Sequence, residues 1–326
     1  TCRSCETTCP SGVDYAHLLD YGRDKVEQQV RRPLWQYWQR NLLRYFLPEP
    51  RRFKPLLRLG QWLRPVLPSS IRKSIPVPVT VLPWPKQQHA RRMILPGGCV
   101  QPSLAPDIDT ATARILDQLG IQLIQAGGCC GAVSHHLSAT QQAKDYARRN
   151  IDAWWPHIEA GAEAIVSNAT GCGVMLKDYA HLLNDDPAYA DKARRITDLS
   201  RDIVEVLEAE DLSKLRLAST HKRISFHAPC TLQHGQGLAG RVEALLRQAG
   251  FELLPIRDAH LCCGSAGTYS ITQPKLSRQL RDNKLAALNQ GSPDLIATAN
   301  IGCLLHLAAD SAVTVKHWIT LFDTEY

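Results

Sequence analysis

Two adjacent cysteines followed by a glycine occur twice in this chain, as Cys129-Cys130-Gly131 and as Cys262-Cys263-Gly264. The two pairs lie about 130 residues apart, and each has one cysteine well before it and one well after it. Eight of the eleven cysteines therefore fall into two sets with similar spacing: Cys99, Cys129, Cys130 and Cys172, then Cys230, Cys262, Cys263 and Cys303. This repetition predicts two copies of one folding unit, each bringing four sulfur atoms together.

Short apolar segments and amphipathic segments alternate through both copies. Residues 93–95 and 224–226 read as strands that run into a cysteine turn, and residues 109–119 and 240–248 read as helices. Ser138 is expected to cap a later helix. The alternation predicts an α/β fold of two repeated units with mostly parallel sheets. Because the carboxyl ends of parallel strands share one edge, we expect the cysteines of each unit to meet there.

Four thiolates in one pocket favour an iron–sulfur cluster or zinc. So few cysteines in a chain of this size suggest a reducing compartment, where disulfides are unusual. Structural zinc stays open as an alternative, although adjacent cysteines do not suit one tetrahedral ion, whereas a cluster offers several metal atoms. Glycines beside the cysteines are expected to adopt positive φ or to allow close backbone approach; they are Gly98, Gly128, Gly131, Gly171, Gly264 and Gly302. Histidines near these turns are expected to bond to nearby backbone, with proton handling as the alternative; they are His135, His136, His227 and His260.

Three further cysteines stand at the start of the sequence. Cys2, Cys5 and Cys9, followed by Pro10, match the last three cysteines of the bacterial ferredoxin run. We expect the sequence to begin inside that motif, with an earlier motif before it. In such runs the fourth cysteine, here Cys9, ligates the other of two clusters. A zinc knuckle and chance are the alternatives, and the trailing proline argues against both.

A basic, aromatic segment follows this motif. Residues 23–92 hold sixteen Lys or Arg and three acidic residues, so the net charge of +7 comes from this part of the chain. Apolar side chains share one helical face within 34–46 and again within 56–67, and residues 69–85 read as an extended, proline-rich linker. The segment is interpreted either as linker helices packed on the body or as a surface for anionic lipid or a partner subunit. No recognised nucleic-acid-binding fold accompanies the charge, so we expect no nucleic-acid partner.

These observations divide the 326 residues into four parts. Residues 1–30 are the C-terminal part of a ferredoxin-like [4Fe-4S] domain, and 31–90 are a basic helical and proline-rich linker. Residues 91–210 form the first cysteine-rich unit, and 220–326 form the second. No apolar run approaches the ~20 residues needed to cross a bilayer.

The repeated Cys…Cys-Cys-Gly…Gly-Cys pattern resembles the cysteine-rich CCG domain of heterodisulfide reductase subunits. Several segments, and most specifically 261–274, resemble more narrowly the family of glycolate oxidase iron–sulfur subunits. That resemblance spans almost the whole chain. It implies two [4Fe-4S] clusters in the ferredoxin-like domain, FAD on a partner dehydrogenase subunit, and electron delivery to a membrane acceptor.

The sequence departs from the heterodisulfide reductase pattern at one position in each unit. Those relatives end each unit with C-x2-C and bind an unusual cluster, but here the last cysteine is replaced by Met175 and by His306. Methionine is a weak ligand for ferric iron, whereas His306 is a competent one. The second unit is therefore predicted to hold a cluster, and the first to be structural.

The sequence thus predicts an iron–sulfur electron-transfer subunit of a flavin-dependent 2-hydroxy-acid dehydrogenase complex, with glycolate as substrate. The alternatives are the equivalent subunit for D-lactate or glycerol 3-phosphate, a thiol–disulfide enzyme of the heterodisulfide reductase type, and a scaffold with structural cysteines. We expect a cytoplasmic protein whose residues 31–73 contact the inner membrane peripherally.

Overall fold

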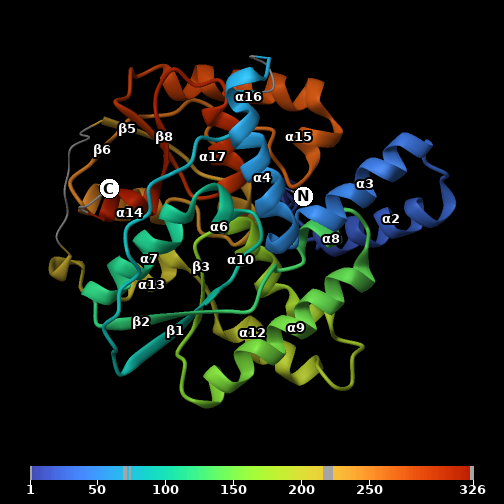
Figure 1. Ribbon diagram of the computed structural model, residues 1–326, viewed down its shortest axis with the longest axis horizontal. Helices are drawn as coiled ribbons and strands as arrows, with labels where there is room; N and C mark the ends of the chain where they lie inside the picture. Colours follow the sequence, from blue (N-terminus) through green and yellow to red (C-terminus); the bar gives the residue numbers. More distant parts are fainter. Residues whose placement is uncertain (1, 69–71, 73–74, 216–222, 324–326) are drawn as a thin grey trace.

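The computed structural model describes residues 2–68, 72, 75–215 and 223–323 (Figure 1). It contains two four-stranded sheets. The first has the order β2-β1-β3-β4, built from β1 (Arg91–Pro96), β2 (Ile121–Ala126), β3 (Ile165–Ser167) and β4 (Ser200–Asp202). The second has the order β6-β5-β7-β8, built from β5 (Arg223–His227), β6 (Glu252–Leu253), β7 (Leu295–Thr298) and β8 (Val315–His317). Every strand pairing is parallel, so the predicted α/β fold with repeated parallel sheets is confirmed.

Helices connect the strands in the same order in both units. The first unit contains α6 (Gln101–Leu104), α7 (Pro106–Gln118), α8 (Ala132–His136), α9 (Thr140–Glu159), α10 (Thr170–Lys177), α11 (Tyr179–Leu182), α12 (Ala190–Leu199) and α13 (Ile203–Glu208). The second contains α14 (Arg241–Gln248), α15 (Tyr269–Thr272), α16 (Pro274–Asn289) and α17 (Ile301–Ala308), with the short helical turns η3 (Thr231–Gly235) and η4 (Trp318–Phe322). The turn η2 (Leu212–Lys214) lies between the two units. The prediction that Ser138 caps α9 is wrong, because Ser138 has a φ of 56° and Ala139 is the N-cap residue. The predicted start of the second unit, residue 220, lies outside the described residues.

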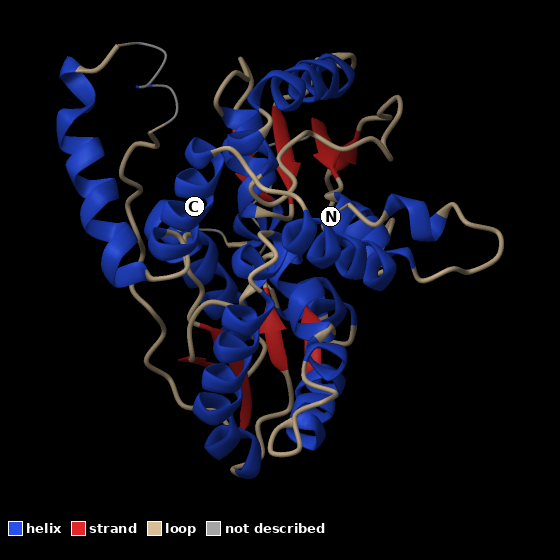
Figure 2. Ribbon diagram, turned by 90° about the vertical axis from the view of Figure 1, so that its right-hand side faces the viewer, coloured by secondary structure: helices blue, strands red, loops and turns tan. Residues whose placement is uncertain are grey.

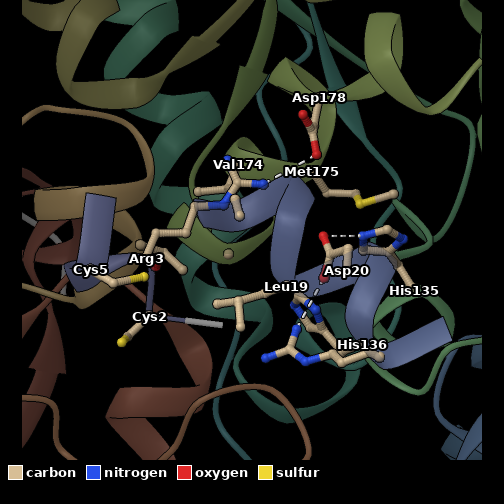
Figure 3. A pocket seen from close by; sticks show the side chains of 14 residues that line it. Cys2, Arg3, Cys5, Leu19, Asp20, His135, His136, Val174, Met175 and Asp178 are labelled. Atoms are coloured by element: carbon tan, nitrogen blue, oxygen red, sulfur yellow. Dashed lines mark hydrogen bonds and ion pairs between the residues drawn. The ribbon is translucent and has the colours of Figure 1, made fainter. Parts of the chain in front are cut away.

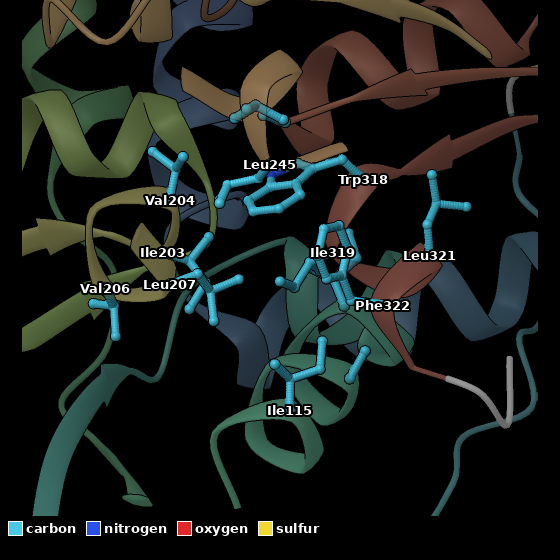
Figure 4. Close-up of a cluster of buried hydrophobic side chains, with 14 of the residues drawn as sticks. Ile115, Ile203, Val204, Val206, Leu207, Leu245, Trp318, Ile319, Leu321 and Phe322 are labelled. Atoms are coloured by element: carbon cyan, nitrogen blue, oxygen red, sulfur yellow. The ribbon is translucent and has the colours of Figure 1, made fainter. Parts of the chain in front are cut away.

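One hydrophobic core joins the two units. Ile115 of α7 and Leu207 of α13 belong to the same buried cluster as Leu245 of α14 and Trp318 and Phe322 of η4 (Figure 4). Complete burial of each large apolar side chain contributes roughly 2 kcal/mol to folding. The units are therefore packed as one body.

The carboxyl edges of the two sheets meet at the boundary between the units. The backbone N–H of Thr170 donates to the carbonyl of Ala299 at 3.3 Å, and the N–H of Gly171 donates to Oδ1 of Asn300 at 3.3 Å. The hydroxyls of Thr170 and Thr231 are 2.7 Å apart. Figure 2 shows the sheets one above the other, with the N-terminus near their boundary. The cysteine turns of both units thus lie at the centre of the molecule.

The N-terminal segment is attached at this central boundary. Its helices are α1 (Ser4–Thr7), α2 (Tyr15–Gln29), α3 (Leu34–Phe46) and α4 (Pro50–Leu63), followed by the turn η1 (Arg64–Val66). Arg3 donates to Asp178 of the first unit at 3.1 Å, and the hydroxyl of Thr7 lies 2.6 Å from Nδ1 of His234 in the second. Helices α2 and α3 project from the body (Figure 1). The structure therefore ties the first cysteine motif to both units.

Asp202 is a buried carboxyl group at the contact between the units. It caps α13 by accepting from the N–H of Val204, and it accepts from Nε2 of Gln236 at 2.8 Å. Burial raises its pKa to about 6, above the ordinary value of about 3.9. Its protonation therefore stabilises the fold fully below about pH 3.9, and this stabilisation is lost as the pH rises through about 6.

Asp202→Asn should make the protein more stable than the unmodified chain at pH 8, by up to about 3 kcal/mol, and the gain should vanish near pH 4. The asparagine oxygen keeps the cap, and the Gln236 amide flips to accept from the new NH2 group. Chemical denaturation at both pH values measures the difference. Asp185→Asn, at an exposed position, is the control with no pH-dependent gain. Equal stability of D202N and the unmodified protein at pH 8 would contradict the assignment.

Candidate metal centre

The structure brings the four cysteine thiols of the second unit together. Cys230 follows β5, Cys262 and Cys263 follow β6, and Cys303 lies in the first turn of α17 after β7. The thiol of Cys262 contacts those of Cys230 and Cys263, and Cys263 contacts Cys303. Hydrogen bonds from neighbouring thiols lower the pKa of Cys262 to about 2 and that of Cys303 to about 5. The thiols of Cys230 and Cys263 donate those hydrogen bonds, which raises the pKa of each. Such a group readily gives up protons to a metal.

One histidine joins this sulfur group. A ligand atom of His227 lies within 4.8 Å of the sulfurs of Cys263 and Cys303, and all three residues are buried. His227 is the last residue of β5, the strand that lies between β6 and β7 in the sheet. Three adjacent strand ends therefore supply one imidazole and two thiols, a donor set that suits zinc or an iron–sulfur cluster.

Polar groups around the second set of cysteines favour ionised sulfur. The N–H of Gly264 donates to Sγ of Cys262 at 3.3 Å, and Nδ2 of Asn300 lies 3.8 Å from Sγ of Cys303. The Lys284 ammonium group is buried, donates to the carbonyl of Asp258 at 2.8 Å, and lies close enough to Cys262 to interact with its charge. Donors and a cation of this kind stabilise thiolates.

The first unit also gathers its four thiols. Cys129 contacts Cys99 and Cys130, and Cys130 contacts Cys172. Thiol hydrogen bonds lower the pKa of Cys130 and raise that of Cys129 and of Cys172. The N–H of Gly131 donates to Sγ of Cys129 at 3.4 Å, which matches the contact of Gly264 in the second unit. All eleven cysteines of the chain are free.

The N-terminal cysteines lie beside both units. Cys2 and Cys5 line a cavity with an empty volume of about 630 Å³, including space open to solvent, which residues of α2, α8, α10 and η3 also line (Figure 3). The charge of Cys2 contributes to the raised pKa of Cys230, so the two sulfurs are near each other. Cys9 does not line this cavity, and the backbone N–H groups of Val13 and Ser11 lower its pKa.

The two residues at the missing-cysteine positions have different surroundings. Met175 is buried and lines the cavity that also holds Cys2 and Cys5. Nε2 of His306 lies 3.1 Å from the hydroxyl and 3.3 Å from the carbonyl oxygen of Ser277. The structure therefore places His227, and not His306, among the candidate ligand atoms that lie close together.

The comparisons with known proteins agree with this geometry. The family model for the cysteine-rich domain, CCG, matches residues 97–177 and 224–308. The glycolate oxidase iron–sulfur subunit of Escherichia coli K12 is 52% identical over 99% of this chain and 80% of that protein. The chain belongs to the family of glycolate oxidase iron–sulfur subunits. The predicted resemblance is confirmed.

Two more distant relatives are also similar to the chain. A Bacillus subtilis protein named "Probable glycolate oxidase iron-sulfur subunit" is 30% identical over 94% of this chain and 75% of its own length. Lactate utilization protein A of Bacillus licheniformis is 31% identical over 64% of this chain and 87% of its own length.

Sequence reasoning misjudged His227 and part of the glycine set. His227 was expected to bond to nearby backbone, but within the described residues neither of its ring nitrogens has a hydrogen-bond partner. Gly98, Gly131 and Gly264 have positive φ. A Cβ at Gly302 would lie 2.8 Å from Oγ of Ser265 and one at Gly171 would lie 3.4 Å from Oδ1 of Asn300, whereas a Cβ at Gly128 would meet nothing within 4 Å. The clue for His227 was its place three residues before Cys230, at the end of a buried strand.

Gly264 sets the backbone path beside the cysteine pair. It has a φ of +89°, and a Cβ there would overlap the carbonyl oxygen of Ser277. Gly250 also has a φ of +89°, but a Cβ at that position would meet nothing within 4 Å. The two positions therefore separate backbone strain from steric overlap.

Gly250→Ala should cost about 1–2 kcal/mol of stability, because alanine pays only for the left-handed conformation. Gly264→Ala should cost a further 1–3 kcal/mol or so because of the overlap, and it should lower the metal content of the second unit. Thermal unfolding and metal analysis measure both effects. Equal losses of stability in the two variants would contradict the prediction, because they would show that the structure relieves the overlap with Ser277 at no cost.

Proposed function

We propose that this chain is the iron–sulfur, electron-transferring subunit of a flavin-dependent complex that oxidises glycolate to glyoxylate. The convergence of three cysteine groups carries the proposal: the N-terminal motif, the first unit and the second unit all present their thiols at the boundary between the sheets. The similarity to the glycolate oxidase iron–sulfur subunit of Escherichia coli supports the choice of complex.

We propose that Cys2, Cys5 and Cys9 supply three of the thiolate ligands of the [4Fe-4S] clusters of a ferredoxin-like domain. The cavity beside Cys2 and Cys5 is lined by Leu19, Val174 and Met175, which exclude water from part of it. Backbone N–H groups that face Cys9 favour its thiolate form. These features fit the thiolate ligation and low polarity of iron–sulfur sites.

A further iron–sulfur cluster is assigned to the second unit, on Cys230, Cys262, Cys263 and Cys303. The polar donors around Cys262 and Cys303 and the buried Lys284 support this choice. The thiols of the first unit, Cys99, Cys129, Cys130 and Cys172, are assigned a structural role. Iron–sulfur clusters, when bound, accept and release single electrons.

The chain's own residues hold these groups close together and connect them to the surface. The cavity beside Cys2 is lined by Gly171 and Thr231, the sequence neighbours of Cys172 and Cys230. Cys262 is only partly buried and borders a surface hollow that Leu280 and Lys284 also line. This hollow is a suitable place for an electron to enter or leave.

The flavin is assigned to a partner subunit, where hydride is taken from the 2-hydroxy acid. Gly235-Gln236-Gly237-Leu238-Ala239-Gly240 matches G-x-G-x-x-G in letters, but β5 ends at His227 and η3 separates it from the motif, whereas a dinucleotide fingerprint follows its strand directly. A second substrate is kept as an alternative because lactate utilization protein A of Bacillus licheniformis is also similar to the chain. Addition of glycolate or D-lactate to the anaerobic complex, followed by spectroscopy of the clusters, decides between the two.

Anaerobically purified full-length protein should contain about eight iron atoms for two [4Fe-4S] clusters, and more if the second unit is loaded. Cys262→Ser should remove only the additional iron and its spectroscopic signal, because the N-terminal ligands are intact. Glycolate-dependent dye reduction should fall in parallel. Cys99→Ser, in the first unit, is the control and should leave the iron content unchanged. Zinc in place of the additional iron would overturn the redox role of the second unit.

We also propose that the helices α3 and α4 contact an anionic lipid surface. Among the described residues, no helix is long and apolar enough to span a membrane. Trp38 of α3 is 63% exposed and Trp62 of α4 is 76% exposed. Arg51, Lys54 and Arg58 of α4 are exposed as well. Exposed tryptophans beside cations fit the headgroup region of an anionic bilayer.

Replacement of Arg51, Lys54 and Arg58 by Gln should weaken binding to anionic vesicles by about 100-fold, since each cation contributes about 1 kcal/mol near such a surface. Vesicle co-sedimentation at two salt concentrations measures this. The matched control replaces Arg195, Lys275 and Arg278, which are exposed on α12 and α16. Equal weakening by both triple variants would indicate a non-specific charge effect and contradict the proposal.

A further inference from the structure

His227 is a buried imidazole whose ring nitrogens make no well-aligned hydrogen bond among the described residues and whose polar neighbours are cysteine sulfurs. Its exposed fraction is 2%, and both Nδ1 and Nε2 lack a partner. Buried polar groups are hydrogen-bonded in the great majority of cases, because an unpaired one costs about 1–3 kcal/mol. One buried nitrogen of several other described histidines also lacks a partner, but His227 has both nitrogens in this state and lies beside two cysteine sulfurs, which fits a metal as the missing partner.

The ring faces the sulfur group. A ligand atom of His227 and the sulfurs of Cys263 and Cys303 lie within 4.8 Å of one another. The imidazole is also close enough to Cys303 to help lower the pKa of that thiol. A metal ion bound by all three would satisfy the imidazole nitrogen and both thiolates together.

The first unit has a different residue where the second has this imidazole. Pro96 occupies the matching place, since Pro96 and His227 are each the last residue of the first strand of their unit and each lie three residues before a cysteine. Ala169 is the N-cap residue of α10 where Asn300 is the N-cap residue of α17. The donor that approaches Cys303 is therefore also replaced in the first unit.

A third difference concerns charge. Tyr146 and Leu280 occupy matching positions, because their Cβ atoms approach the glycines that follow the two cysteine pairs. The residue four places later is Asn150 in the first unit and Lys284 in the second. Asn150 uses its amide to hold the backbone of the cysteine loop, whereas Lys284 adds a buried cation. All three differences favour an anionic, metal-bearing site in the second unit.

We propose that His227 is a nitrogen ligand of the metal centre in the second unit, on the same iron–sulfur cluster as Cys263 and Cys303. This inference rests on the cluster that the proposed function assigns to that unit. His227 takes the role that the sequence pattern suggested for His306, whose Nε2 is occupied by Ser277. A histidine ligand in place of cysteine raises the reduction potential of a cluster. The second centre is therefore the more oxidising one and receives electrons from the N-terminal clusters.

The test uses full-length protein, purified anaerobically and labelled with ¹⁵N only in histidine. Pulsed electron paramagnetic resonance of the reduced protein should show a strongly coupled nitrogen whose frequency changes with the label. This measurement needs no variant, so a folding defect does not affect it. A cluster signal assigned to the second unit without such a nitrogen would overturn the inference and leave the cluster itself in place.

Variants then identify the histidine. His227→Cys should keep the additional iron, lose the nitrogen coupling and lower the midpoint potential of that centre. His306→Gln is the matched control and should retain the nitrogen coupling. Loss of the coupling in H306Q with retention in H227C would overturn the assignment. If the protein has no iron beyond the N-terminal clusters, the cluster proposal for the second unit fails. If the second unit holds zinc instead of iron, X-ray absorption at the zinc edge tests His227 as a ligand. Loss of the imidazole scattering in H227C would still support that role.

Discussion

The backbone hydrogen bond from Thr170 to Ala299 joins the edges at which both parallel sheets end. The cysteines of each unit lie at the carboxyl edge of its sheet, since each follows a strand, in a loop or, for Cys172 and Cys303, in the first turn of a helix. Had the edges faced away from one another, the two sulfur groups would lie at opposite ends of the molecule. Their meeting also creates the place where α1 is held through Arg3 and Thr7. Proximity of the three cysteine groups therefore depends on the meeting of these edges, which the shared hydrophobic core also maintains.

The fold could be predicted from sequence because its signals are local and repeated. Apolar strands, amphipathic helices and the spacing of Cys129-Cys130 and Cys262-Cys263 each recur, so one copy corroborates the other. The boundaries of the four predicted parts stay predictions, as do the roles of the individual cysteines. Ser138 shows where local reasoning fails: a good capping residue stands one position too early, and tertiary packing places it in a left-handed turn.

The candidate site was less accessible to sequence reasoning for a different reason. His306 attracted attention because it occupies the position of a missing cysteine, which is a one-dimensional argument. His227 enters the sulfur group because the strand that carries it is central in the sheet, between the strands that precede Cys263 and Cys303. That neighbour relation is set by strand order, which the sequence leaves open. The roles of Lys284 and Asn300 likewise follow only from their closeness to the cysteines in the folded chain.

The shared hydrophobic core has a consequence for how such a chain can evolve. After a duplication, one copy is normally free to be deleted once it loses its activity. Here, removal of the first unit would expose Trp318, Phe322 and Leu245 of the second, because Ile115 and Leu207 cover them. A copy with no metal would thus still be kept by selection for a stable protein. The first unit keeps all four of its cysteines, so its divergence from the second is seen instead in the groups around them, Pro96, Ala169 and Asn150.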